Sequence, residues 1–364
     1  MATKSKVADR SFRVGCGRYI QENGAISHLK EEMARLGCTH PFILAGENAW
    51  RAAGEKIEAA LAGTEPVFET FSGYCVSARC EAITAREDVR TADLVIGVGG
   101  GILMDAAKLC AIMLRLPVLL IPTSSATCAA CAPLSVTYDE IGRPCGTRHH
   151  DREVNCVLAD MDILAAQPVR LFVSGVYDAM AKVMETRQRI EGREESEVDI
   201  GLRSSYELSK FSFERLNADF DTAVQALEKH EGTKELFDSI YISLCLTGVI
   251  SGLARGSNQT AIAHKIYESA RALYPTEAVK ALHGELVAVG LIAQLAYYGE
   301  TEQAEAFRQG MKHKHLPTSF AEWGIPSGDE VREAIYQKML LSSAMAGTTA
   351  EEHARLRSAL QWII

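Results

Sequence analysis

The side chains that could carry chemistry fall in a few short stretches. Cys128 and Cys131, in ATCAACAP, have the C-x-x-C spacing of a thioredoxin-like redox pair or of half a zinc site. A redox pair of this kind normally follows a strand and opens a helix in a thioredoxin-like unit, and the surrounding sequence contains no such unit. The spacing alone therefore assigns the two cysteines neither a redox nor a zinc-binding role.

A glycine-rich stretch, GVGGGILMDAAK (97–108), places Gly99, Gly100 and Gly101 between an apolar run and a helical pattern. Glycines at such a turn let backbone N–H groups approach a phosphate, and the N-terminus of the helix adds a favourable partial charge. The pattern is not the full G-x-G-x-x-G, because Ile102 stands at its sixth position. A tight turn without a ligand is the alternative, but the flanking strand and helix favour a phosphate-containing ligand.

Two histidines lie in or beside apolar helical stretches, His264 in TAIAHKIYES and His283 in KALHGELVAVG. A neutral imidazole in such a setting can bind zinc or iron. The separation of these two residues matches neither a zinc finger nor H-E-x-x-H. Asp178, in FVSGVYDAMAKVMETR, is predicted to begin a helix after Gly175, where an aspartate more often stabilises the helix N-terminus. Spacing alone does not join these residues into one metal site.

The secondary structure predicted to position these residues differs between the two halves of the chain. The first half alternates helical patterns with short apolar runs of strand type, and 135–146 is predicted to form a hairpin that turns near 139–142. Repeated βαβ units of this kind imply a parallel sheet that is covered on both faces. The strands are predicted over 40–47, 65–73, 93–101, 116–124 and 155–160, and the helices over 26–37 and 104–115.

After Pro168 the chain shows long helical patterns, with a charged loop or helix end over 188–200. The segments 238–252 and 283–299 are apolar nearly all round, as expected for helices buried in a bundle. We therefore predict an α/β domain over residues 1–165 and an all-helical domain over residues 166–364.

Composition limits the class of partner. The chain of 364 residues is 47% hydrophobic and 23% charged, with a net charge of −9, which disfavours nucleic acid or an anionic membrane as the main partner. The apolar run 109–122 is interrupted by Arg115 and Pro117 and is too short to span a bilayer. We expect a small-molecule substrate.

Cysteine usage and the N-terminus indicate the compartment. No apolar stretch follows the basic residues of MATKSKVADRSF, so no secretory signal is predicted. Ten cysteines in a long chain of this kind are expected to be reduced thiols, most of them small buried apolar groups. The protein is expected to be cytoplasmic.

Five motifs, taken in order, resemble the glycerol dehydrogenase-like branch of the iron-containing alcohol dehydrogenases over almost the whole chain. The resemblance implies a dehydroquinate synthase-like fold, with an α/β dinucleotide-binding domain, an all-α domain and an active site in the cleft between them. It also implies a homo-oligomer and one divalent metal, zinc or iron, bound by Asp178, His264 and His283. The motifs are GVGGGILMDAAK, IPTSSATCAACAPLSVTYDEIG, LFVSGVYDAMAKVMETR, AIAH and LHGELVAVG.

The same resemblance implies a nicotinamide coenzyme. The metal would polarise the substrate oxygen while hydride passes between the coenzyme and the carbinol carbon. Gly46 in ILAGENAW stands where NAD-specific relatives often have an acidic residue. Gly46 leaves room for a 2′-phosphate, Glu47 opposes one and Arg51 could pair with one, so NAD and NADP both stay open. The residues matched to the coenzyme are Gly46, Gly99, Gly100, Gly101, Asp105, Thr123, Ser124 and Ser135.

The identity of the residue at position 128 helps to predict the class of substrate. Typical glycerol dehydrogenases have an aspartate facing the polyol at the matching position, and a neutral thiol there would ease entry of a substrate carboxylate. The stretch TCAACAPLSV is similar to that of hydroxycarboxylate dehydrogenases, which reduce 2-oxo acids. We therefore predict a 2-hydroxy acid/2-oxo acid pair as substrate, with a polyol such as glycerol as the alternative. Cys131 is expected to pack nearby.

A second departure concerns the motif AHKIYES. Relatives usually have a second histidine three residues after the ligand, often followed by Asn, where this chain has Tyr267 and Glu268. Tyr267 has a high ordinary pKa, so a proton relay through its hydroxyl is in question. A non-catalytic relative that binds metal and nucleotide is thus an open alternative. A dehydroquinate synthase-like lyase is disfavoured, because only Lys182 and Lys265 lie around the proposed ligands.

Overall fold

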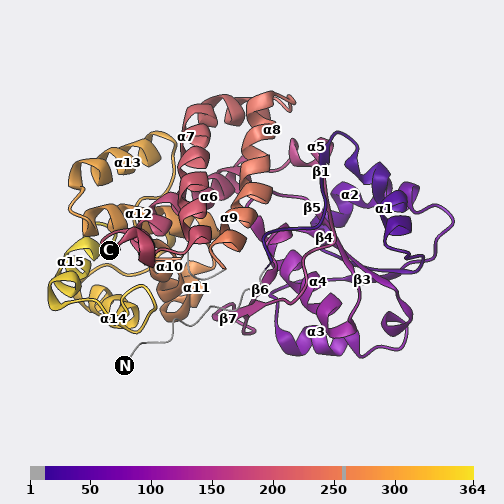
Figure 1. Cartoon of the computed structure of the whole chain (residues 1–364), viewed down its shortest axis with the longest axis horizontal. Coiled ribbons are helices and arrows are strands. Elements are labelled where there is room, and N and C mark those ends of the chain that lie inside the picture. The colour runs from indigo at the N-terminus through magenta and orange to yellow at the C-terminus, as the bar shows by residue number, and fades with distance from the viewer. Residues whose placement is uncertain (1–12, 256–259) are drawn as a thin grey trace.

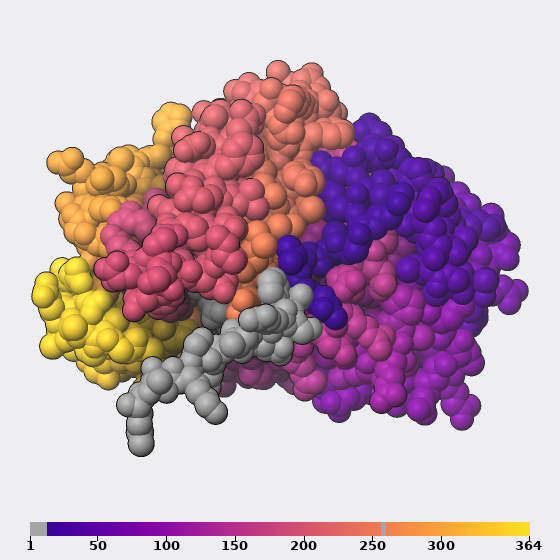
Figure 2. Space-filling view, viewed as in Figure 1, coloured from indigo at the N-terminus to yellow at the C-terminus, as the bar shows by residue number. Residues whose placement is uncertain are grey.

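The computed structural model describes residues 13–255 and 260–364. The first half of the chain, indigo to magenta in Figure 1, forms an α/β part, and the remainder forms a helical part beside it. The space-filling view in Figure 2 shows the two parts side by side, with the indigo end on the right and the yellow end on the left. Residues 1–12, from which no secretory signal was predicted, lie outside the described residues.

The α/β part contains a six-stranded sheet in which every neighbouring pair is parallel. Five of its six strands lie within the runs predicted as strands, one in each run, whereas the first strand, Tyr19–Glu22, was not predicted. In sheet order they are β1 (Tyr19–Glu22), β8 (Cys156–Asp160), β5 (Val118–Pro122), β4 (Leu94–Gly99), β2 (Pro41–Ala45) and β3 (Val67–Thr70).

Helices cover both faces of this sheet, so its central strands are buried on two sides and appear in the sequence as continuous apolar runs. Val95 and Leu120 pack with helices on one face, while Ile96 and Ile121 face the opposite layer, as strand alternation requires. One layer holds α3 (Ser77–Thr84) and α4 (Gly101–Leu114), with η2 (Val89–Thr91) before β4; the other holds η1 (Ala25–His28), α1 (Leu29–Arg35) and α2 (Glu47–Ala60).

The predicted hairpin is present. After η3 (Cys128–Ala130), strands β6 (Leu134–Tyr138) and β7 (Pro144–His149) pair antiparallel as a separate two-stranded sheet. Asp139 Oδ1 accepts hydrogen bonds from the backbone N–H groups of Ile141 and Arg143, which closes the turn. The hairpin extends from the α/β part toward the helical part (Figure 1).

The helical part is built around α6 and α12, whose residues are mostly buried and pack against each other. Its elements are α5 (Met161–Leu164), α6 (Val169–Ile190), η4 (Glu195–Glu197), α7 (Ile200–Glu228), α8 (Lys234–Tyr241), η5 (Ile242–Leu246), α9 (Thr247–Leu253), α10 (Ile262–Leu273), α11 (Pro275–Ala278), α12 (His283–Tyr297), α13 (Thr301–His313), η7 (Phe320–Trp323), α14 (Asp329–Leu340) and α15 (Ala350–Leu360).

Elements α8, η5 and α9 run on as one helical stretch, Lys234–Leu253, in which η5 is a π-helical segment. By length and composition alone this stretch could cross a membrane, and the sequence analysis had tested only 109–122 for a span. Two thirds of its most apolar window (67%) is buried inside the molecule. This burial agrees with the prediction of a core helix over 238–252.

One predicted helix start is wrong. Helix α6 begins at Val169, so Asp178 lies in its interior and does not begin a helix after Gly175. Gly175 is needed for close packing, because a Cβ there would lie 1.8 Å from the carbonyl oxygen of Ser125. A glycine that permits two backbones to touch resembles a helix boundary in the sequence.

The cysteines are free thiols, as predicted, and all except Cys16, Cys128 and Cys145 are buried. Cys131 does not face Cys128 but packs against Cys16, with 3.8 Å between the two sulfur atoms. The C-x-x-C spacing therefore corresponds to two thiols in different surroundings.

Candidate active site

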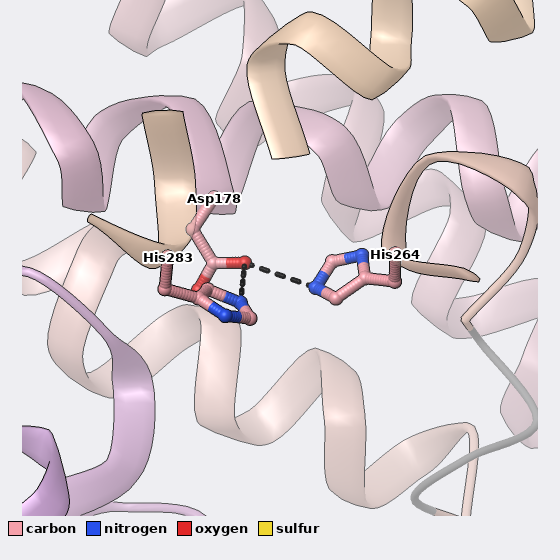
Figure 3. A group of neighbouring side chains, drawn as sticks. All are labelled: Asp178, His264 and His283. Carbon is pink, nitrogen blue, oxygen red and sulfur yellow. Dashed lines mark ion pairs between the residues drawn. The ribbon is translucent and has the colours of Figure 1, made fainter. Parts of the chain in front are cut away.

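Three side chains from three helices converge at one point. Asp178 lies on α6, His264 on α10 and His283 at the first position of α12, and Figure 3 shows their polar ends pointing toward one another. Asp178 Oδ1 lies 3.2 Å from His264 Nε2 and 3.4 Å from His283 Nε2. The possible ligand atoms of the three residues all lie within 4.8 Å of one another. Folding thus joins residues that the sequence spacing could not join.

The geometry of this triad suits a divalent ion of the zinc or iron type. Zinc bonds to nitrogen and oxygen of about 2.0–2.1 Å in a tetrahedral site leave neighbouring ligand atoms about 3.3–3.4 Å apart. The two measured separations from Asp178 Oδ1, 3.2 and 3.4 Å, match that edge length. Two imidazoles and one carboxylate are also a donor set that zinc and iron accept, and three protein ligands leave a position open.

A second carboxylate orients His264. Glu185 Oε2 lies 2.5 Å from His264 Nδ1, on the ring edge opposite Asp178. Its other oxygen accepts hydrogen bonds from the backbone N–H groups of Ala261 (2.8 Å) and His264 (3.1 Å). Burial opposes ionisation of this carboxyl, but His264 and Lys182 outweigh burial and hold the pKa of Glu185 below its ordinary value. Such an outer carboxylate fixes the ring and leaves Nε2 available to a metal.

Lys182 lies one helical turn after Asp178 and is buried in the same site. Its Nζ lies 3.3 Å from Asp178 Oδ1 and 3.2 Å from His264 Nε2. Burial favours the neutral forms of both side chains, yet Lys182 and His283 lower the pKa of Asp178 well below its usual value. Lys182 and Glu185 were not predicted as part of the site, although their spacings of four and seven from Asp178 place all three on one helix face.

The triad opens into a cleft of ≈ 1610 Å³, which residues of both parts of the chain line. This volume exceeds that of a typical small-molecule pocket and suits an extended ligand together with a substrate. All but one of the predicted site residues line it: Gly46, Gly99, Gly100, Gly101, Asp105, Thr123, Ser124, Cys128, Asp178, His264, Tyr267 and His283.

Ser135 is the exception. It does not line the cleft, although its neighbours Leu134 and Val136 do, because alternate residues of strand β6 point to opposite faces. The Ser135 hydroxyl donates to the carbonyl oxygen of Asp105 at 2.8 Å and lies 2.8 Å from His150 Nε2. Its contacts tie the hairpin to α4.

The glycine turn forms one wall of the cleft. Strand β4 ends at Gly99 and α4 begins at Gly101, so the N-terminus of a 14-residue helix opens toward the cavity. A Cβ at Gly101 would lie 2.5 Å from Thr127 Oγ1, which shows how closely the next loop approaches. Exposed N–H groups at a helix N-terminus without a side-chain cap are a favourable place for a phosphate.

Lys108, on α4, holds the loop that carries Cys128. Its buried Nζ donates to the carbonyl oxygens of Ala129 (2.7 Å), Ala132 (3.0 Å) and Leu134, and lies 3.0 Å from Asp105 Oδ1. Burial raises the pKa of Asp105 although Lys108 opposes the change. Asp105 thus lines the cleft while paired internally, and the sequence analysis had not identified Lys108 as its partner.

Cys128 and Tyr267 line the cleft close to the triad. Burial and the nearby Asp178 carboxylate raise the pKa of Cys128 to about 11, so its thiol is neutral at physiological pH. The Tyr267 ring packs edge-on against His283, with ring centroids 4.4 Å apart. Burial also raises the pKa of Tyr267, and its hydroxyl shares a hydrogen bond with Tyr138 of the hairpin. Both positions present uncharged groups.

Gly46, which also lines the cleft, follows strand β2 and precedes α2. Arg51 is already engaged, with its Nη2 3.2 Å from Glu47 Oε1 and its Nη1 donating to Asn48 Oδ1 at 3.0 Å. A 2′-phosphate would have to compete with Glu47 for this guanidinium, whereas a 2′-hydroxyl would leave the pair intact.

Comparison with known proteins agrees with this geometry. The model of the family "Iron-containing alcohol dehydrogenase" matches residues 16–162. The chain is 30% identical over 318 residues to a glycerol dehydrogenase of Thermotoga maritima, covering 85% of this chain and 84% of that protein. It is 28% identical over 311 residues to hydroxycarboxylate dehydrogenase A of Escherichia coli, with 85% and 84% covered.

A solved structure shares the fold over nearly the whole length. Glycerol dehydrogenase from Schizosaccharomyces pombe superimposes with a TM-score of 0.82 at 22% identity, covering 97% of this chain and 91% of that one. The predicted fold class, an α/β part with a parallel sheet followed by a helical part, is confirmed.

Proposed function

The chain belongs to the iron-containing alcohol dehydrogenase family and is an oxidoreductase of CH–OH groups, and on that premise we propose that it interconverts a small 2-hydroxy acid and the corresponding 2-oxo acid. We further propose NAD or NADP as the hydride carrier and zinc or iron as the metal. The proposal rests above all on one observation: the neutral Cys128 lies in the same cleft as the Asp178, His264 and His283 triad.

The substrate class follows from charge. With Cys128 neutral, a substrate carboxylate meets no like charge from this residue. Two other carboxylates that line the cleft, Asp105 and Glu268, are paired with Lys108 and Lys265. The similarity to hydroxycarboxylate dehydrogenase A supports the same class.

Each part of the site has a task in this reaction. When bound, a divalent ion supplies Lewis acidity toward the oxygen of the reacting carbon, and a nicotinamide ring gives or takes the hydride. Asp178, His264 and His283 would hold the ion, while Glu185 keeps the His264 ring in place. The N–H groups at the start of α4 would bind the coenzyme phosphates. The Tyr267 ring limits the freedom of His283.

The test is a coenzyme-linked absorbance assay on zinc-loaded and iron-loaded protein. NADH and NADPH are each combined with 2-oxobutyrate, 2-oxoglutarate and dihydroxyacetone. We expect turnover of an oxo acid in preference to dihydroxyacetone. Turnover of dihydroxyacetone alone would contradict the proposal, and so would failure of every pair in protein that holds both metal and coenzyme.

A polyol dehydrogenase is the second candidate. It is supported by the similarity to the glycerol dehydrogenases of Thermotoga maritima and Schizosaccharomyces pombe. Glycerol oxidation with NAD or NADP, set beside the oxo-acid reduction, separates the two candidates directly.

A cytoplasmic location and a homo-oligomeric state remain predictions. The free thiols of all ten cysteines are compatible with a reducing compartment. Sedimentation of the purified protein would give the oligomeric state.

A further inference from the structure

We propose that Lys182 is the residue that recognises the substrate carboxylate, and that it selects a carboxylate bonded directly to the reacting carbon. This inference rests on the proposed 2-oxo acid reaction and goes beyond it, since it names the specificity-determining side chain. Lys182 would touch the substrate, in addition to its contacts within the protein.

Lys182 lies beside two of the proposed metal ligands. Its Nζ lies 3.3 Å from Asp178 Oδ1 and 3.2 Å from His264 Nε2, and these two atoms lie 3.2 Å from each other. The ammonium group therefore forms a nearly equilateral triangle with two proposed ligand atoms. The residue borders the cleft and is only 3% exposed, so its side chain has little contact with bulk solvent.

Metal binding would take away the hydrogen-bond acceptors of Lys182. Once Asp178 and His264 serve as metal ligands, the lone pairs that now face Lys182 are directed elsewhere. A buried ammonium that loses its hydrogen-bond acceptors is strongly destabilised unless another anion replaces them. Glu185 is already committed to His264 and to two backbone N–H groups. A substrate carboxylate would supply the missing acceptor.

The other lysine and arginine side chains described in the lining of the cleft already have hydrogen-bond or ion-pair partners. Among the described residues that line it, Lys265 contacts both oxygens of Glu268 at 2.7 Å. Arg271 donates to the carbonyl oxygens of Ala278 and Gly142, and Lys56 pairs with Asp162 at 2.6 Å. Lys182, in contrast, contacts Asp178 and His264 of the triad.

Geometry then selects the position of the carboxylate. In a 2-oxo acid the carboxylate is bonded to the carbonyl carbon, so carboxylate and carbonyl oxygens lie side by side. The Lys182 ammonium group, 3.2–3.3 Å from two proposed ligand atoms, lies close enough to the triad to meet a carboxylate on the reacting carbon. In a 3-oxo acid the intervening carbon carries the carboxylate away from Lys182.

The test uses full-length, metal-loaded protein and two variants, Lys182→Met and Lys182→Arg. Oxamate, an unreactive 2-oxo acid analogue, is titrated calorimetrically into the NADH complex, and metal content is measured on each sample. We expect the Met variant to bind oxamate at least about tenfold more weakly, as loss of a hydrogen bond to a charged group implies, while the Arg variant retains part of the affinity. Its kcat/KM should fall by a similar factor for 2-oxobutyrate, with a much smaller change for dihydroxyacetone.

Lys265→Met is the matched control, because it removes a cleft lysine whose charge Glu268 already balances. It should leave the ratio of the two kcat/KM values within about twofold of the wild-type ratio. A structural role for Lys182 predicts equal losses on the charged and the neutral substrate, or loss of metal without a change in that ratio. Either result overturns the inference, as does unchanged oxamate affinity in the Met variant.

A measurement on the wild-type protein keeps the inference testable if a variant does not fold. The methyl ester of 2-oxobutyrate lacks the charge and should have at least about tenfold lower kcat/KM than the acid. A 3-oxo acid such as acetoacetate should be a similarly poor substrate, and equal use of either compound would refute the selection. Absence of any 2-oxo acid turnover defeats the proposed function itself, whereas turnover that is insensitive to Lys182 defeats this inference alone.

Discussion

The imidazole of His264 and the carboxylate of Glu185 lie 2.5 Å apart, measured from Nδ1 to Oε2, although 79 residues separate them in the chain. The contact turns the other ring nitrogen toward Asp178, which lies two turns earlier on the same helix as Glu185. One face of α6 thus supplies both a proposed ligand and the group that orients another. The site depends on how α6 packs against α10 and α12.

Removing a ligand should remove the metal. In His283→Ala, zinc content measured by atomic emission after gel filtration is expected to fall to near background, and the dehydrogenase activity by at least about 100-fold. His313→Ala, on the exposed side of α13, should retain both. Full zinc content in the His283 variant would contradict the assignment.

Glu185→Gln should weaken metal binding without abolishing it. Loss of an outer carboxylate typically lowers metal affinity by about 10- to 100-fold, because the His264 ring is less well held and less basic. Competition with a chelator measures this, and Glu191→Gln, at the exposed C-terminal end of α6, is the control. Equal affinity in the Glu185 variant and the wild type would show that the contact does not orient the ligand.

A negative charge at Cys128 should shift substrate preference. Cys128→Asp is expected to raise KM for 2-oxobutyrate by at least about tenfold, since like charges in a confined site repel strongly, with a smaller effect on dihydroxyacetone. Steady-state kinetics with both substrates measures the shift, and Ser358→Asp on the exposed side of α15, away from the cleft, is the control. A variant that handles the two substrates as the wild type does would make Cys128 incidental.

Gly175→Ala should destabilise the fold. A Cβ at this position would lie 1.8 Å from the carbonyl oxygen of Ser125, so backbone must move, at an expected cost of about 1–3 kcal/mol in the free energy of unfolding. Gly310→Ala, inside α13 with nothing within 4 Å of the new Cβ, should instead stabilise by about 0.5–1 kcal/mol. Urea denaturation measures both, and a neutral effect of Gly175→Ala would mean that the close approach is relaxed in solution.

His150 should contribute a pH dependence of stability. Burial, with Lys108 nearby, lowers the pKa of His150 to about 4 from its ordinary value of 6.5. Between these values the unfolded chain binds a proton that the folded chain excludes, so the folded state loses stability as pH falls from 6.5 to 4. His150→Asn should flatten the slope of Tm against pH in this window, whereas His149→Asn, at the exposed end of β7, should not. An unchanged slope in His150→Asn would contradict the shift.

Strands β2, β4, β5 and β8 were predictable because each is a short apolar run that is buried along its whole length. Strand β1, with the sequence YIQE and only partial burial, was not predicted. The hairpin was predictable because its turn residues act locally, as Asp139 does. The start of α6 was not, since Gly175 serves a contact with Ser125 that no local pattern records. Ser135 was assigned to the coenzyme from its segment, but strand alternation turns it away.

The sequence by itself determined the class of the fold and the glycine turn, and through its motifs it predicted Asp178, His264 and His283 as metal ligands. The fold class, the glycine turn and the motifs depend on local sequence patterns, which can be recognised without the tertiary structure. Only the tertiary structure decided that the three side chains share one point, that Glu185 orients His264 and that Lys182 faces the same atoms. Distances between helices depend on the packing of many side chains at once, and no spacing in the chain encodes them.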